Sequence, residues 1–204
     1  MDATVFVVDD DPAVRDSLGL LLGLRGLRTQ MFSSAESFLQ AYDPAASGCA
    51  LIDVRMPGMD GLALFDTILQ RQWSLPCIVI SAYGDVAMTR KALKAGAFDF
   101  LEKPFDDVDV LVDVIQNAIS LDATRRREST AHRQISDRLQ RLTGREHEVM
   151  KLLVEGHSNR QVAEELGISP RTVEVYKARV LEKLQVRTIT DLVRIALGAE
   201  PPQR

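Results

Sequence analysis

A β-branched run passes into a proline-started helical pattern at residues 4–26, which read TVFVVDDDPAVRDSLGLLLGLRG. Thr4–Val8 has the composition of a short buried strand. Asp11 and Pro12 then supply a capping carboxylate and a first-turn proline for a helix that ends near Gly26. The stretch therefore predicts a strand followed directly by a helix.

The same strand-then-helix pattern recurs four more times along the chain. The expected pairs are 28–32 with 34–42, 49–54 with 61–72, 76–81 with 85–95, and 98–102 with 105–121. Nearly continuous apolar strands separated by helices require a parallel sheet that is covered on both faces. We therefore expect an α/β domain with a five-stranded, doubly wound parallel sheet, whose ligand crevice lies beyond the carboxyl ends of the strands.

The chain changes character after residue 121. Residues 122–138 are polar and include the basic run Arg125–Arg127, which favours a solvated helical linker over a dedicated nucleic-acid contact. The sequence leaves open whether this linker continues the preceding helix or is hinged from it. Residues 139–204 show four short helical patterns, at 143–156, 158–166, 169–184 and 188–197. The second and third meet in a short glycine-containing turn, which is typical of a helix-turn-helix. We expect domains at 1–121 and 139–204, joined by a linker at 122–138.

Composition narrows the class of protein. The 204 residues are 46% hydrophobic and 26% charged, which is an ordinary globular balance. The apolar runs are too short to span a membrane, and the amino terminus lacks a signal-peptide pattern, so a cytoplasmic protein is expected. Cys49 and Cys77 lie in apolar runs, where they are expected to be buried small hydrophobes.

Charge is divided unevenly along the chain. Residues 1–121 hold 9 Lys/Arg against 17 Asp/Glu, whereas residues 122–204 hold 16 against 12. An acidic first part and a basic second part indicate two different kinds of partner.

Acidic side chains close two of the expected strands. Asp9 and Asp10 end the first strand and Asp53 ends the third, so the fold should bring them to one edge of the sheet. Clustered carboxylates repel one another unless a cation lies among them. Mg²⁺, or Mn²⁺, is the expected ion, because hard cations prefer oxygen ligands. Asp11, directly before Pro12, is expected only to cap the first helix.

A hydroxyl and an ammonium group complete this edge. Ser81 ends the fourth strand and Lys103 follows the fifth. An oxygen nucleophile, a metal and donors for the remaining oxygens are the parts that phosphoryl transfer requires. The first strand–helix turn is acidic rather than glycine-rich, which argues against nucleotide binding.

Ten short motifs resemble those of one family. Five resemble bacterial response-regulator receiver domains, which have a flavodoxin-like fold: VVDDD at 7–11, DVRMPGMDG at 53–61, SAYGD at 81–85, KAGAFDF at 94–100 and EKPF at 102–105. Five more resemble the LuxR-type helix-turn-helix: LTGRE at 142–146, NRQVA at 159–163, LGIS at 166–169, TVEV at 172–175 and LEKL at 181–184. Together they are similar to the NarL/FixJ family of two-component regulators, closest to the FixJ branch.

The resemblance implies roles for the acidic residues. Asp53 would be the phosphoacceptor, taking a phosphoryl group from a sensor histidine kinase. The side chains of Asp10 and Asp53 and the backbone carbonyl of Arg55 would ligate the metal, with Asp9 acting through water.

The resemblance also implies a switch. Ser81 and Lys103 would bind phosphoryl oxygens, and the Lys103–Pro104 bond would be cis. Phe100 would be the aromatic switch residue, although an ordinary core aromatic is the simpler interpretation of this position on its own. The face around 85–100 would then form a homodimer when the protein is phosphorylated. The fourth C-terminal helix resembles a dimerisation helix, but its apolar residues also suit the core of the small domain.

The third C-terminal helix is the candidate DNA reader. Val173, Tyr176, Val180 and Leu184 follow helical core spacing and should face inward. Glu174 could accept from a cytosine amino group and Val175 could touch a thymine methyl, with basic residues on phosphates. The expected DNA-binding set is Arg160, Arg171, Thr172, Glu174, Val175, Lys177, Arg179 and Lys183.

These observations predict a phosphorylation-dependent transcriptional regulator, expected to be an activator that binds double-stranded promoter DNA and acts with RNA polymerase. It would catalyse only its own phosphorylation and dephosphorylation. One alternative is a Mg²⁺-dependent aspartyl-phosphate phosphatase of the haloacid-dehalogenase type. That class needs Asp-x-Asp after the first strand, which this chain lacks. Another is a DNA-binding regulator that does not depend on phosphorylation.

Overall fold

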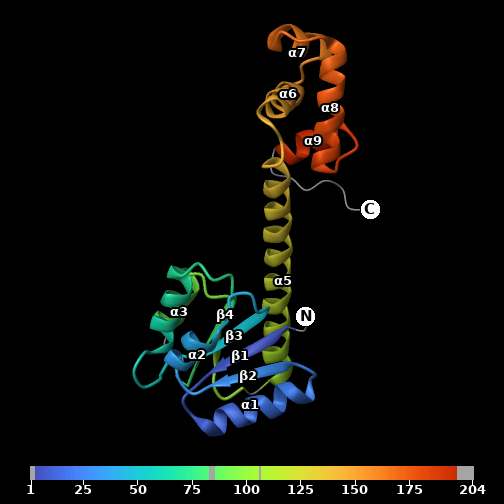
Figure 1. Cartoon of the computed structure of the whole chain (residues 1–204). Coiled ribbons are helices and arrows are strands. Elements are labelled where there is room, and N and C mark those ends of the chain that lie inside the picture. The colour runs from blue at the N-terminus through green and yellow to red at the C-terminus, as the bar shows by residue number, and fades with distance from the viewer. Residues whose placement is uncertain (1–2, 83–85, 106, 197–204) are drawn as a thin grey trace. The chain divides into compact units, whose positions relative to one another are not determined.

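The computed structural model describes residues 3–82, 86–105 and 107–196. The chain divides into two compact units, Met1–Arg126 and Arg127–Arg204, and each is described by itself (Figure 1). Among the described residues, no helix is both long and apolar enough to cross a membrane.

The first unit is built on a parallel sheet. Its strands are β1 (Thr4–Val8), β2 (Arg28–Phe32), β3 (Gly48–Asp53), β4 (Cys77–Ser81) and β5 (Asp99–Glu102). They lie in the order β2-β1-β3-β4-β5, and every neighbouring pair is parallel. The chain crosses over between β2 and β3, so β1 and β3 are neighbours. The expected five-stranded doubly wound sheet is confirmed.

Helices cover both faces of the sheet (Figure 1). They are α1 (Pro12–Leu24), α2 (Ala35–Ala41), α3 (Gly61–Gln70), α4 (Val86–Lys94) and α5 (Val108–Leu139). One apolar core joins the sheet to α2, α3 and α4, and the other joins it to α1 and α5. The strands alternate their side chains between these two cores, which is why they are apolar along nearly their whole length. Cys49 and Cys77 are buried in them, as expected.

Helix starts in the first unit follow the capping residues of the sequence. Asp11 caps α1, its carboxylate accepting from the Ala13 amide at 2.8 Å, as expected. Ser34 caps α2 in a reciprocal pair with Ser37. The expected start of α4, at residue 85, lies outside the described residues.

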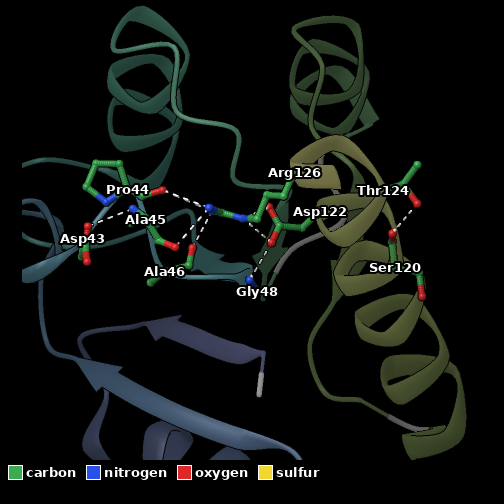
Figure 2. Close-up of polar contacts among 9 residues, drawn as sticks. All are labelled: Asp43, Pro44, Ala45, Ala46, Gly48, Ser120, Asp122, Thr124 and Arg126. Carbon is green, nitrogen blue, oxygen red and sulfur yellow. Dashed lines mark hydrogen bonds and ion pairs between the residues drawn. The ribbon is translucent and has the colours of Figure 1, made fainter. Parts of the chain in front are cut away.

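Helix α5 differs from the expected helix over 105–121. It begins at Val108 because the Asp107 carboxylate accepts from the amides of Asp109 and Val110. It continues without a break to Leu139, so the expected linker is part of the same helix. The two compact units divide inside α5, after Arg126. Figure 2 shows the contacts that hold residues 122–126 to the first unit.

The second unit is all-α in its described residues. Its helices are α6 (Gly144–Val154), α7 (Asn159–Leu166), α8 (Pro170–Leu184) and α9 (Ile189–Ala196). Thr143, Ser158 and Ser169 cap the first three. All four contribute to a single core, which also receives Ile135 and Leu139 from the end of α5. The expected end of the last helix, at residue 197, lies outside the described residues.

Candidate functional site

Two buried carboxylates meet at the carboxyl edge of the sheet. Strands β1 and β3 run in register, with Val8 beside Ile52, so the next residues along each strand are neighbours. Those residues are Asp9 and Asp53, which are only 1% and 6% exposed. Asp10, by contrast, is exposed. The fold thus brings Asp9 and Asp53 together, as the strand ends predicted, and leaves the neighbouring Asp10 exposed.

Lys103 lies between these two carboxylates. Its Nζ donates to Asp9 Oδ2 and to Asp53 Oδ1, each at 2.6 Å. Lys103 follows β5, two strands away from β3, and the Lys103–Pro104 bond is cis, as expected. One ammonium group therefore serves two carboxylates, and an excess of negative charge remains at this edge.

Backbone amides bind the remaining carboxylate oxygens. Asp9 Oδ1 accepts from the Asp11 amide at 2.9 Å, and Asp53 Oδ2 accepts from the Arg55 amide at 2.7 Å. Arg15 Nη1 donates to the backbone carbonyl of Asp9 at 2.6 Å. Sequence reasoning did not single out Arg15. Its position one turn into a helix that begins beside the acidic edge is the signal that pointed to it.

The charges at this edge shift one another's pKa. Burial raises the pKa of Asp53; the hydrogen bond and charge of Lys103 oppose this rise, and the Asp9 carboxylate adds to it. Burial by itself would lower the pKa of Lys103, but its bonds to Asp53 and Asp9 outweigh that effect and raise it. Lys103 thus remains charged at neutral pH.

The loop after Asp53 is tightly placed. A Cβ atom at Gly61 would lie 2.0 Å from the Asp53 carbonyl oxygen, so only glycine allows α3 to start this close to the strand. Glu36, from α2, accepts from the Met59 amide at 3.0 Å and ties the loop from outside. These contacts fix the backbone around Asp53 and Arg55.

The two expected switch residues lie on neighbouring strands. Ser81 is 2% exposed and ends β4, beside the strand that ends in Asp53. Phe100, in β5, is half-buried and packs against the core beneath α2, α3 and α4. The structure thus places Ser81 at the same edge as the carboxylates and Phe100 one strand further along.

The acidic edge has donor chemistry that suits a hard cation. Its side-chain donors are carboxylate oxygens, which Mg²⁺ and Mn²⁺ prefer, and its net charge is negative. Among the described residues, however, no three acidic, histidine or cysteine side chains converge on one point. A cation at Asp9 and Asp53 would compete with Lys103 for the same oxygens. The residues at this edge therefore provide the type of ligand atom that the metal prefers.

Helix α8 presents an exposed polar face. Val173, Val180 and Leu184 are buried and Tyr176 is partly buried in the core, as their spacing predicted. The outward face carries predicted DNA contacts that are exposed: Arg171, Glu174, Val175 and Arg179. Thr172 and Lys177 are half-buried, and the Thr172 hydroxyl bonds with Ser169 at the helix start.

Two further predicted DNA contacts have partners within the unit. Lys183 Nζ donates to the buried Glu146 carboxylate at 2.6 Å and to the Arg141 carbonyl at 3.2 Å. Arg160 pairs with Glu164 on the exposed surface of α7. The Arg160–Glu164 pair is solvated and can exchange partners, whereas the Lys183 ammonium neutralises the buried Glu146 carboxylate.

The fold and its two sites define a class of protein. An α/β domain with paired aspartates and a lysine at the carboxyl edge precedes a helix-turn-helix with a polar outward face. Comparison with family models agrees with this class: residues 5–116 match the response regulator receiver domain, and residues 140–196 match the bacterial regulatory proteins of the luxR family. The chain belongs to the two-component response regulators that join a receiver to a LuxR-type DNA-binding domain.

Individual relatives extend along nearly the whole chain. The transcriptional regulatory protein FixJ of Bradyrhizobium diazoefficiens is 41% identical, covering 96% of this chain and 95% of the relative. The C4-dicarboxylate transport transcriptional regulatory protein DctR of Rhodobacter capsulatus is 43% identical, covering 96% and 100%.

Solved structures show the same domains. The response regulator StyR matches with a TM-score of 0.90 at 40% identity, covering 97% of this chain and 99% of that one. Full-length FixJ from B. japonicum matches with a TM-score of 0.59 at 40% identity, covering 96% of each chain. This chain is a response-regulator transcription factor, with a histidine kinase and DNA as its implied partners.

Proposed function

We propose that this regulator binds promoter DNA when Asp53 carries a phosphoryl group. The observation that carries the proposal is the shared ammonium: Lys103 bonds both Asp53 and Asp9, which leaves this edge with negative charge in excess. Such an edge favours a cation and suits a reaction in which Asp53 gains a group and Lys103 gains a new acceptor.

The proposed chemistry is a transfer between two side chains. An Asp53 carboxylate oxygen forms a bond to phosphorus as the bond from phosphorus to the kinase histidine nitrogen breaks, and that nitrogen keeps the bonding electron pair. Lys103 neutralises charge on a phosphoryl oxygen, and the Ser81 hydroxyl donates to another. Bound Mg²⁺ or Mn²⁺, held by Asp9, Asp10, Asp53 and the Arg55 carbonyl, would supply further charge neutralisation.

The proposed switch links this chemistry to assembly. The phosphoryl group draws Ser81 toward it, and Phe100 fills the space that is left. A phosphoryl group adds charge at one point, so a distant effect needs such a two-state element. The face at 85–100, part of which lies outside the described residues, then pairs two copies of the chain.

Pairing would place two copies of α8 on a two-fold DNA site. Glu174 and Val175, both exposed on α8, would contact base edges, and Arg171, Arg179, Lys177 and Arg160 would contact phosphates. Thr172 stays in the proposed DNA-binding set. We leave Lys183 out of this set because its ammonium neutralises the buried Glu146. The protein is proposed to act in the cytoplasm as an activator, with RNA polymerase as a further partner.

Labelled acetyl phosphate and binding to fragmented genomic DNA test the proposal together. The wild-type chain should take up label in the presence of Mg²⁺ and bind selected fragments more tightly. Asp53→Asn should lose both effects. Asp66→Asn, on the exposed side of α3, is the matched control and should keep them. Label that persists in Asp53→Asn would overturn the assignment, and tight binding without phosphorylation would favour a constitutive regulator.

A further inference from the structure

Only one arginine of the run at 125–127 points into the first unit. Arg125 and Arg127 are exposed, whereas Arg126 is half-buried on the side of α5 that faces the sheet. Arg126 Nε donates to both carboxylate oxygens of Asp122, one helical turn earlier, at 2.9 and 2.8 Å (Figure 2). A basic run that the sequence assigns to a solvated surface thus contains one residue that binds groups within the first unit.

The guanidinium group of Arg126 also binds a loop from a distant part of the sequence. Its two Nη atoms donate to the backbone carbonyls of Pro44, Ala45 and Ala46 (Figure 2). This loop connects α2 to β3. The planar fork of five N–H donors suits arginine to such a cluster of oxygen acceptors, and lysine lacks that geometry.

Asp122 completes the contact from the other side. It is 1% exposed, and its Oδ2 accepts from the Gly48 amide at 2.9 Å. Gly48 is the first residue of β3, and a Cβ atom there would lie 1.8 Å from the Thr4 carbonyl oxygen. The Asp122–Arg126 clamp, defined by these two residues, therefore closes on a packed corner where β1 and β3 begin.

The clamp lies beyond the apolar packing of α5. Ala118 is the last residue of α5 buried in the first unit's apolar core, and Ile135 is the first to pack in the second unit's core. Residues 127–134, all of them described, belong to neither core and are almost all exposed. Isolated helices shorter than about 12–15 residues are marginal in water. Without the clamp, the unsupported part of α5 would begin soon after Ala118 and roughly double in length.

We propose that the Asp122–Arg126 clamp fastens α5 to the receiver and is required to transmit the state of Asp53 to DNA binding, but not for phosphorylation itself. The inference rests on the proposed function. The clamp and Asp53 occupy opposite ends of β3, so loss of the clamp leaves the acidic edge intact. Arg126 and Asp122 act as positioning residues.

Matched variants of the full chain test this inference. Arg125→Ala, Arg126→Ala and Arg127→Ala each remove one positive charge from the same helix turn. Only Arg126→Ala should speed amide hydrogen exchange over residues 119–134, by about tenfold or more. All three should take up label on Asp53 from acetyl phosphate at the wild-type rate. Only Arg126→Ala should lose most of the gain in DNA affinity that phosphorylation produces.

A second pair of variants keeps the test decisive. Asp122→Asn should reproduce Arg126→Ala, and Arg126→Lys should give an intermediate effect because it keeps the charge without the fork. Unchanged amide hydrogen exchange in Arg126→Ala would show that the clamp does not fasten α5 to the receiver. Faster exchange with a full gain in DNA affinity would overturn its role in transmission. A wild-type chain that shows no gain in DNA affinity on phosphorylation would reject the proposed function. The hydrogen-exchange result would still show whether the clamp fastens α5 to the receiver.

Discussion

Strand β3 has a buried aspartate–cation contact at each end, and the two contacts are built differently. At the carboxyl end, Asp53 and Asp9 share the single ammonium of Lys103. At the amino end, Asp122 faces Arg126, and carbonyls of the 44–46 loop occupy the rest of the guanidinium. The first contact has negative charge in excess, and the second is balanced and saturated with hydrogen bonds.

This difference is what we expect between the proposed phosphoacceptor site and a structural contact. A balanced pair with all its donors and acceptors in use has little to gain from a new ligand, and breaking it leaves a buried charge alone. A pair of carboxylates with one cation gains from any added positive charge or neutralising group. The balance of charges and hydrogen-bond partners around a buried aspartate therefore indicates better than its burial whether it would gain from a new ligand.

The largest expected contrast is chemical. With labelled acetyl phosphate and Mg²⁺, label should appear on Asp53 in the wild-type chain and in Asp122→Asn, and be absent in Asp53→Asn. Peptide mapping of the labelled protein is the measurement. Label at Asp122, or its loss in Asp122→Asn, would show that the two ends of β3 do not differ in this way.

Stability should fall when the balanced contact is broken. Asp122→Asn removes the charge that compensates Arg126 and should lower the free energy of unfolding of the first unit by about 2 kcal/mol. This is less than the roughly 3–5 kcal/mol that breaking a fully buried ion pair costs, because the Arg126 side chain is 25% exposed. Urea denaturation followed by the fluorescence of Trp73, the only tryptophan, measures it. Arg125→Ala is the control, with an expected change within about 0.5 kcal/mol.

The same substitution at the other end of β3 should have the opposite sign. Because the folded-state pKa of Asp53 lies above its ordinary value of 3.8, stability falls as pH rises through that interval, and the ionised carboxylate is unfavourable at neutral pH. Asp53→Asn removes this charge and leaves Lys103 paired with Asp9. Its free energy of unfolding at pH 7 should rise by about 1 kcal/mol. A decrease in the same urea experiment would contradict the unbalanced character of this edge.

The smallest expected effect concerns the Glu146–Lys183 pair, a balanced contact in the second unit. The hydrogen bond from Lys183, followed by that from the Thr143 amide, lowers the pKa of Glu146 below 4.5. The pair therefore stabilises the unit fully above pH 4.5, and this contribution is lost as pH falls through the lowered pKa. Glu146→Gln should reduce stability by about 1 kcal/mol at pH 7 and flatten the acid dependence. Urea titrations followed by the methyl NMR signals of Val149 and Val180 would show whether it does.

Much of the molecule was predictable because its signals are local in the sequence. Apolar runs and capping residues predicted every strand and most helix starts, and strand ends predicted that Asp9 and Asp53 would meet. Helix spacing predicted which side of α8 is buried. The start of α5 at Val108 was missed because Asp106 and Asp107 are both capping residue types, and the sequence alone does not choose between them.

The polar partners were not predictable in the same way. The sequence predicted Arg126 to lie in a solvated linker and Lys183 to contact DNA, and in neither case did it indicate a partner within the protein. Their partners lie about 80 and 37 residues away, at Ala46 and Glu146. Arg15 was missed for another reason: its partner lies only six residues away, but it is a backbone carbonyl, which carries no side-chain pattern.

The sequence by itself determined the fold class, the edge at which chemistry is expected and the helix that is expected to face DNA, because each depends on a periodic pattern or on the end of a strand. Only the tertiary structure decided which charges are shared, balanced or solvated. Those properties depend on distances of a few ångströms between residues far apart in the chain, and on how much water the surrounding packing excludes.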